Sequence, residues 1–405
     1  MSKHLPIVAA INKALHAAWR TGRWQPPTLN PDAIEAYASR KEGVTRVPGR
    51  HWREAYSVLL DDLERQSQLS PLGRVIANGQ MVKLLRGRIR AERLLLRKPE
   101  ILEQPLGEPV IIVGQMRSGT TRLHRLLSCD PNFAHTRLFE SLEPIPYSRG
   151  HDRRLPLGAA VTAFLRLANP ATQRVHPTGP LRPEEEFGFN SFSFHGAQFE
   201  VQWSVPGFAH LCEERDTGSA YAEFRTLVQI TRWARREKAE RPWLLKCPQF
   251  TADLESLLQV FPNARFLFLH RRYADVVGSS ASLVREQRCI HSEHVDPHAI
   301  GREWLRKTRF RAERVARFRG ANPQVPRLDV DFDEVSRDWL SQIRRIYAFL
   351  EIPLAPETMN RMQRYAGRAT AHRGHSYALE EFGLSPRLVE ETLAQSSISR
   401  VAELA

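Results

Sequence analysis

One short segment of the chain has the residues of a phosphate-binding loop. Residues 114–121 read GQMRSGTT, after the apolar run PVIIV at 109–113 and before RLHRLL at 122–127. Gly114 ends an expected buried strand, Gly119 allows the backbone to turn closely around an anion, and the following helix presents unpaired backbone N–H groups to it. The sequence therefore predicts a strand, an anion-binding loop and a helix in succession.

The loop departs from the pattern of nucleotidases at one decisive position. Gly114 and Gly119 have the separation of the GxxxxGK[ST] motif, but Thr120 stands where that motif has lysine. Arg117 supplies a cation earlier in the loop instead. The loop suits a phosphate group better than a triphosphate with a metal ion, and an ordinary turn between strand and helix is the alternative.

A second candidate anion site lies in the run RFLFLHRRYADVVGSSASLV at 265–284. Arg271 falls at the end of an expected buried strand, where open α/β sheets bind their ligands. Ser279 follows eight residues later, so the two side chains can converge on one phosphate. The alternative is that Arg271 and Arg272 form ion pairs with carboxylates at the start of a helix.

The elements around these motifs predict a three-layer, P-loop-like α/β fold with a central parallel sheet, because continuous apolar strands alternate with helices. We expect a helical N-terminal region at 1–104, an α/β core at 105–355 with an insertion at about 140–225, and a C-terminal helical tail at 356–405 packing on the core. The expected strands are 109–113, 243–246, 265–270 and 326–331.

Composition narrows the class of protein. The 405 residues are 42% hydrophobic and 26% charged, an ordinary globular composition, and 59 Lys+Arg against 45 Asp+Glu give a formal charge of +14. That excess favours an anionic partner: nucleic acid, an acidic membrane or a phosphorylated small molecule. The four cysteines form no CxxC pair, and no apolar run is long enough to cross a membrane or to act as a signal peptide. We therefore expect a cytoplasmic protein.

The chain resembles the sulfotransferases that use 3′-phosphoadenosine 5′-phosphosulfate (PAPS), most closely bacterial members with a helical N-terminal region. The resemblance covers about 105–395 and rests on PVIIVGQMRSGTTRLHRLL, WLLKCPQFTADLESLLQVFPNARFLFLHRR, RRYADVVGSSASL and LDVDFDEVSRDWLSQIRRIYAFLEIPL, in family order. It implies that Arg271 and Ser279 bind the 3′-phosphate and that the loop binds the 5′-phosphate side through Arg117, Ser118, Gly119, Thr120 and Thr121. The family's common His-Arg-Asp-Pro string reads HRRY at 270–273 here, without its acid and its proline.

The implied reaction moves a sulfuryl group from PAPS to a hydroxyl or amine of a small-molecule or lipid-like acceptor and releases adenosine 3′,5′-bisphosphate, with no metal required. Arg117 is a candidate to neutralise the phosphate left behind. Lys246, at the end of an expected strand, is a candidate to protonate or stabilise the leaving oxygen. Pro248 stands where animal cytosolic members place a histidine base, so another residue must remove the acceptor proton.

Candidates for that base lie in HPTGPLRPEEEFGF at 176–189. Other branches of the family use a glutamate, and we favour Glu185. Glu184, Glu186 and His176 remain alternatives, as does a solvated acidic turn. Apolar neighbours that raise the pKa of a glutamate would suit it to the role of a base.

Three further groups of residues carry less specific patterns. The residues Cys289, His291, His294 and His298 match no standard zinc spacing, so we predict no metal site. The basic helix at 302–320 suggests nucleic-acid binding, but we favour a solvated helix face and expect neither nucleic acid nor a membrane span. A further group is expected to close over the donor: His372, Arg373 and His375.

The aromatic residues of the insertion indicate either a hydrophobic acceptor pocket or ordinary core: Phe187, Phe189, Phe192, Phe194, Phe199 and Trp203. The identity of the acceptor stays open. A homodimer is one possible assembly. Two rival functions are a P-loop small-molecule or nucleoside kinase and a basic nucleic-acid-binding protein without catalysis.

Overall fold

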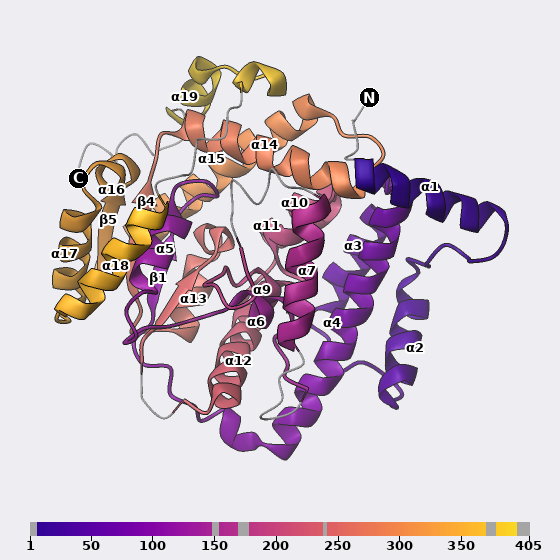
Figure 1. The fold of residues 1–405 in the computed structure, drawn as a ribbon, viewed down its shortest axis with the longest axis horizontal. Coiled ribbons are helices and arrows are strands. Elements are labelled where there is room, and N and C mark those ends of the chain that lie inside the picture. Colours follow the sequence, from indigo (N-terminus) through magenta and orange to yellow (C-terminus); the bar gives the residue numbers. More distant parts are fainter. Residues whose placement is uncertain (1–5, 148–153, 169–177, 238–240, 370–377, 395–405) are drawn as a thin grey trace.

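A computed structural model describes residues 6–147, 154–168, 178–237, 241–369 and 378–394 (Figure 1). Five parallel strands form one sheet in the order β2-β3-β1-β4-β5. The strands are β1 Val110–Val113, β2 Ala134–His135, β3 Trp243–Lys246, β4 Arg265–His270 and β5 Arg327–Asp331. The four predicted strands are confirmed, and the two-residue strand β2 is an addition that the sequence did not reveal.

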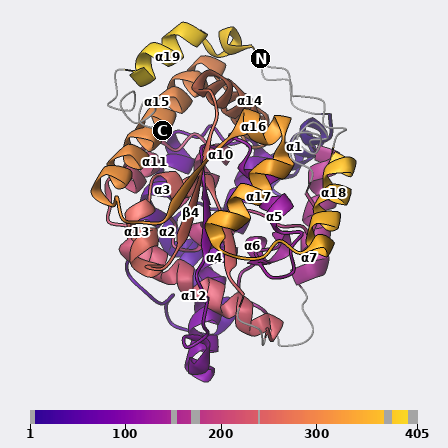
Figure 2. The ribbon, with the colours of Figure 1, turned by 90° about the vertical axis from the view of Figure 1, so that its left-hand side faces the viewer.

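Helices cover both faces of the sheet, as the continuous apolar strands predicted. On one face, Val110 and Ile112 of β1 pack in a core with α5 Thr120–Leu127, α17 Trp339–Leu350 and α18 Pro356–Ala369. On the other face, Ile111 and Val113 share a core with α12 Gly218–Arg235, α13 Leu254–Val260 and α15 Pro297–Ala321. The two views show these layers on either side of the strands (Figures 1 and 2). The predicted three-layer parallel fold is confirmed.

The N-terminal extension is helical and continues the second core. Its elements are α1 Pro6–Arg20, α2 Pro31–Glu42, α3 Arg53–Arg65, α4 Pro71–Arg97 and the short η1 Pro99–Ile101. Leu59 and Leu85 of this region belong to the same buried cluster as Ile111 of the sheet. The boundaries at residues 104 and 355 stay predictions.

The segment between β2 and β3 contains short helices and much of the aromatic core. It holds α6 Leu138–Leu142, α7 Arg154–Ala168, α9 Phe187–Phe192, α10 Ala197–Gln202 and α11 Pro206–Glu214 before α12. Phe189, Phe194, Phe199 and Trp203 are fully buried, and the Phe194 ring packs at a tilt against Trp52 of the extension, with 5.5 Å between the ring centres. These aromatic residues therefore join the insertion to the N-terminal helices as core.

The remaining elements follow the carboxyl ends of the strands or lie near the C-terminus. They are η2 Pro248–Thr251, α14 Tyr273–His291, α16 Phe332–Arg337, η3 Leu379–Phe382 and α19 Pro386–Ala394. Phe382 and Val389 pack in one buried cluster with Val277 of α14 and Trp304 of α15. The C-terminal elements thus cover the two long helices that follow β4.

Candidate active site

The predicted anion-binding loop joins the central strand β1 to α5. A Cβ atom on Gly114 would lie 2.6 Å from Ser118 Oγ and 2.7 Å from Thr120 Cγ2, so no side chain fits there. Gly119 has a φ of +93°, and a Cβ on it would lie 2.4 Å from the Phe332 ring. No side chain caps the start of α5, which leaves its first N–H groups available to an anion. Both glycines are therefore required by geometry.

Arg117 joins the two predicted phosphate sites. Its φ of 71° lies in the left-handed region that residues other than glycine seldom adopt. Its Nε donates to Ser279 Oγ at 2.9 Å, and its carbonyl accepts from Arg271 Nη1 at 2.8 Å. The neighbouring Ser280 donates to the carbonyl of Met116 at 3.1 Å. The loop and the segment after β4 thus meet, and we call Arg117, Arg271 and Ser279 the arginine cluster.

Arg271 follows β4 directly and lies against α16. The carbon of its guanidinium is 4.3 Å from the centre of the Phe332 ring, a cation–π contact. Its Nε is 3.8 Å from a carboxylate oxygen of Asp275, and Arg272 pairs with the same carboxylate at 3.3 Å. Arg271 and Arg272 therefore do form ion pairs with a carboxylate at the start of the helix. Arg271 also donates a hydrogen bond to the loop.

A second cluster of charged groups forms at the end of β3. Lys246 pairs in register with Ile112 of β1, and its side chain is only 1% exposed. Its ammonium group forms an ion pair with the Glu185 carboxylate and donates to Thr121 Oγ1 at 3.1 Å. Thr121 Oγ1 also lies 3.4 Å from Glu185 Oε1. We call Thr121, Glu185 and Lys246 the lysine cluster; three distant segments build it.

The three consecutive glutamates have different surroundings. Thr178 donates to the Glu184 carboxylate at 2.6 Å. The fully buried Glu186 accepts the backbone N–H of Lys246 at 2.8 Å. Burial raises the pKa of Glu186 to about 8, and that N–H works in the opposite direction. Glu185 is the member of the triplet whose carboxylate contacts the Lys246 side chain.

Phe332 is a site residue that sequence reasoning missed. Its ring touches the loop at Gly119 and lies under the guanidinium of Arg271. The signal was present, because Phe332 directly follows the expected strand 326–331 and therefore lies at the same edge of the sheet as Arg271. Four other predicted residues cannot be placed, because they lie outside the described residues: His176, His372, Arg373 and His375.

The basic helix α15 forms several ion pairs and is partly buried. Arg306 pairs with Glu213 at 2.7 Å, Arg319 pairs with Asp329 at 2.7 Å, and the buried Lys307 pairs with Glu200. Trp304 and Phe318 of this helix are core residues. One side of the helix therefore packs into the fold, whereas Arg302, Arg306 and Arg317 on the other side are exposed, as expected for a solvated face.

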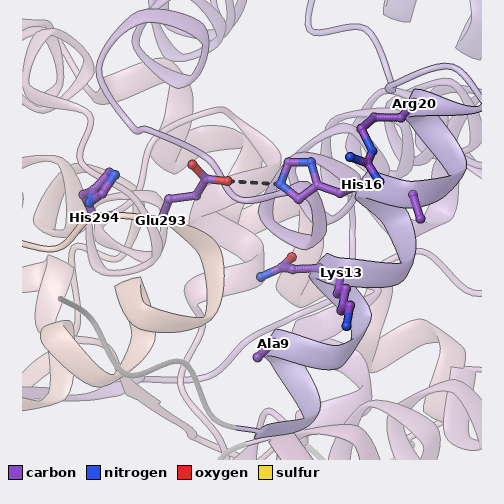
Figure 3. A pocket seen from close by; sticks show the side chains of 8 residues that line it. Ala9, Lys13, His16, Arg20, Glu293 and His294 are labelled. Atoms are coloured by element: carbon purple, nitrogen blue, oxygen red, sulfur yellow. Dashed lines mark hydrogen bonds and ion pairs between the residues drawn. The ribbon is translucent and has the colours of Figure 1, made fainter.

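The histidines considered as metal ligands point to different surroundings. His291 is buried, with Nδ1 2.9 Å from the carbonyl of Gln287. His294 lines a surface groove of about 510 Å³ beside α1, in which His16 faces Glu293 at 3.4 Å (Figure 3). Over the described ranges, no three metal-ligating side chains come together, and no helix is long and apolar enough to span a membrane.

A glycine-containing loop after the central strand of a parallel sheet, with the arginine and lysine clusters at the carboxyl edge, is an arrangement suited to anionic ligands. The chain belongs to the sulfotransferase family, whose model matches residues 109–356. Two solved structures share the fold. Sulfotransferase STF1 from Mycobacterium tuberculosis H37Rv has 24% identity over 92% of this chain and 100% of its own, with a TM-score of 0.79. Sulfotransferase STF9 from Mycobacterium avium has 23% identity over 91% and 96%, with a TM-score of 0.80. A comparison with curated proteins gives no match.

Proposed function

We propose that the chain transfers the sulfuryl group of PAPS to a hydroxyl or amine of a small-molecule or lipid-like acceptor and releases adenosine 3′,5′-bisphosphate. The observation that carries the proposal is the hydrogen bond between Arg117 and Ser279 at 2.9 Å. It joins the loop to the site after β4, so one ligand with two separate phosphate groups can contact both. Membership of the sulfotransferase family supports the same conclusion.

The donor would be held by two kinds of group. Backbone N–H groups of the loop and of the first turn of α5 suit the 5′-phosphosulfate, with the hydroxyls of Ser118, Thr120 and Thr121 beside them. Arg271 and Ser279 would hold the 3′-phosphate, and Arg117 lies between the two sites. Arginine suits this role because its planar group donates two parallel hydrogen bonds to a phosphate.

The lysine cluster would carry out the transfer. The S–O bond to the donor phosphate breaks as a new S–O bond to the acceptor forms, and the acceptor proton passes to the Glu185 carboxylate. Lys246 stabilises the charge that develops on the phosphate oxygen left behind. Lys246 and Glu185 neutralise each other in their ion pair. Donor binding would draw the ammonium group toward the phosphate and free a carboxylate oxygen to act as base.

The positive charge in this scheme comes from Arg117, Arg271 and Lys246, so the proposed reaction requires no metal ion. We also propose a cytoplasmic location, consistent with cysteines that are free thiols in the structure. The acceptor class is open to direct assay of labelled sulfate transfer to sterols, phenols, glycolipids and sugars. Transfer to sugars alone would contradict a lipid-like acceptor.

Ligand-dependent thermal unfolding tests the donor. Adenosine 3′,5′-bisphosphate should raise the unfolding midpoint with concentration, as binding to the folded state requires, and should do so more than ATP with Mg²⁺ or single-stranded DNA. Stabilisation by ATP with Mg²⁺ but not by the bisphosphate would favour a kinase. Stabilisation by DNA alone would favour a nucleic-acid-binding protein.

The Arg271→Ala variant tests the 3′-phosphate site. Loss of a charged hydrogen-bonding partner should weaken the bisphosphate about 10- to 100-fold. Adenosine 5′-phosphate, which lacks the 3′-phosphate, should bind almost as before. The matched control is Arg272→Ala, since Arg272 is exposed and forms an ion pair with Asp275. Equal losses for both nucleotides would remove Arg271 from this role.

A further inference from the structure

A cavity of about 470 Å³ lies between the end of α11, the start of α13 and the second half of α15. Its lining includes no member of the arginine cluster or the lysine cluster. The volume falls within the range of small-molecule sites. The same helix α15 touches the donor loop one turn earlier, where Gln115 Nε2 donates to the carbonyl of Thr308 at 3.1 Å.

Arg311 is the unusual residue of this cavity. It is 6% exposed and lines the cavity, yet among the described residues it makes no hydrogen bond or ion pair. Its neighbours on α15 are satisfied: Lys307 pairs with Glu200, and Arg314 donates to the carbonyl of Glu213 at 2.9 Å. A second arginine of the lining, Arg215, has a buried Nε without a partner.

An unpaired guanidinium in such a place is unfavourable unless something compensates it. Burying a charge without a hydrogen-bonding partner destabilises a folded protein, so buried charges are normally paired. Burial alone would raise the pKa of Glu200, but the charges of Lys307 and then Arg311 lower it. The positive charge of Arg311 thus partly balances the negative charge of Glu200, although the direct ion pair of Glu200 is with Lys307. The donor groups of Arg311 remain available to a ligand.

The charges of the walls indicate the class of that ligand. Glu255 also lines the cavity, is half-buried, and has no hydrogen bond or ion pair among the residues that the structure describes. Charged groups of both signs complete the lining, with carboxylates at Glu214 and Asp216 and guanidinium groups at Arg314 and Arg317. A ligand of a single charge sign would match only one of these two sets. A molecule with one carboxylate and one ammonium group matches both signs.

We propose that this cavity binds a small zwitterion of the free amino-acid class, with the carboxylate of the ligand on Arg311 and its ammonium group facing Glu255. The site is separate from the proposed sulfuryl transfer and does not depend on it. A carboxylate held by a buried guanidinium makes a charge-assisted, two-pronged hydrogen bond.

Thermal unfolding of the full chain tests the proposal with the twenty free amino acids, each titrated into the millimolar range. Acetate and methylamine serve as probes with a single charge. At least one amino acid should raise the midpoint with concentration, and more than either single-charge probe. Arg311→Met should weaken that amino acid at least about 10-fold, whereas Arg271→Ala should leave its binding unchanged. Absence of any stabilising amino acid, or stabilisation that survives Arg311→Met, would overturn the proposal.

The stability of the ligand-free variants separates binding from a structural role. Arg311→Met should unfold at the same midpoint as the wild-type chain or a higher one, because an unpaired buried charge is removed. Lys307→Met should unfold at a lower midpoint, because it leaves Glu200 buried without its partner. A loss of stability in Arg311→Met as large as that in Lys307→Met would show that Arg311 only balances Glu200, and the proposal would fail.

Discussion

The arginine cluster and the lysine cluster lie at the same edge of the sheet but differ in how their positive charges are balanced. In the arginine cluster, the two guanidinium groups donate to the Ser279 hydroxyl and to the carbonyl of Arg117, and the Asp275 carboxylate near Arg271 can balance only one of the two charges. In the lysine cluster, the ammonium group of Lys246 is neutralised by Glu185. A site that keeps its positive charge is suited to hold an anion throughout a reaction. A site whose charges cancel is suited to exchange partners during the reaction.

This difference in charge balance also suggests which cluster determines donor affinity and which determines the rate of the reaction. Interactions that are equal in the ground state and the transition state affect affinity, whereas those that strengthen in the transition state affect the rate. We therefore expect substitutions in the arginine cluster to change donor affinity and substitutions in the lysine cluster to change kcat.

Lys246→Met should have the largest effect on the reaction. It removes the group that we propose stabilises the leaving phosphate oxygen, and kcat should fall about 1000-fold, as when an enzyme loses a preorganised donor. Steady-state kinetics with saturating donor would measure this. The control is Lys83→Met, which removes a half-buried lysine that donates to the carbonyl of Leu142 at 2.7 Å. A similar loss of kcat in both variants would point to a general loss of structure.

Glu185→Gln should lower kcat about 100-fold or more, since it removes a general base but keeps the size and hydrogen-bonding shape of the side chain. The Kd of adenosine 3′,5′-bisphosphate should change little. The matched control is Glu184→Gln, because the Glu184 carboxylate contacts Thr178 rather than Lys246. If Glu184→Gln reduces kcat as much as Glu185→Gln, the proton acceptor is not Glu185.

The stability of the fold around the lysine cluster should depend on pH because Glu186, which accepts the backbone N–H of Lys246, titrates there. We propose no such titrating group for the arginine cluster. Its pKa is raised by burial from 4.5 to about 8, so between these values the folded chain keeps a proton that the unfolded chain releases. The stabilising contribution is complete at low pH and is lost as the pH rises through about 8. The slope is at most about 1.4 kcal/mol per pH unit.

Denaturant unfolding between pH 5 and 8 would measure that slope in the wild-type chain and in Glu186→Gln. The glutamine keeps an oxygen that can accept the backbone N–H of Lys246 but cannot titrate. The free energy of unfolding of the variant should therefore decline less with pH than that of the wild-type chain. Parallel profiles for the two proteins would mean that Glu186 does not titrate in this range.

The arginine cluster was predictable because its signals are local in sequence. The glycine-containing loop at 114–121 and the Arg271–Ser279 spacing each lie within one strand-to-helix connection, and continuous apolar runs located four of the five strands. The lysine cluster was less so. Only the path of the chain distinguishes Glu185 from its neighbours. It places the Glu184 carboxylate against the Thr178 hydroxyl and the Glu186 carboxylate against the backbone N–H of Lys246. Composition could not reveal that path.

Other features were hidden for physical reasons. A strand of two residues, Ala134–His135, has no detectable alternation, and it forms only because β3 provides a partner. The aromatic residues of the insertion looked equally suited to a pocket or to a core, and Phe194 is packed against Trp52, which lies far away in the sequence. Contacts between distant segments decide such cases, and periodicity reports only on local structure.

The smallest expected effect comes from two adjacent serines of α14 and tests the arginine cluster most finely. Ser279 Oγ accepts from Arg117, whereas Ser280 Oγ donates to the carbonyl of Met116 at 3.1 Å. Ser279→Ala should weaken adenosine 3′,5′-bisphosphate about 10-fold, through loss of a charged hydrogen bond and of a contact to the 3′-phosphate. Ser280→Ala should change affinity about twofold or less, because only a neutral contact to the loop is lost. Titration calorimetry would resolve the two, and equal losses would mean that both serines merely pack α14 against the loop.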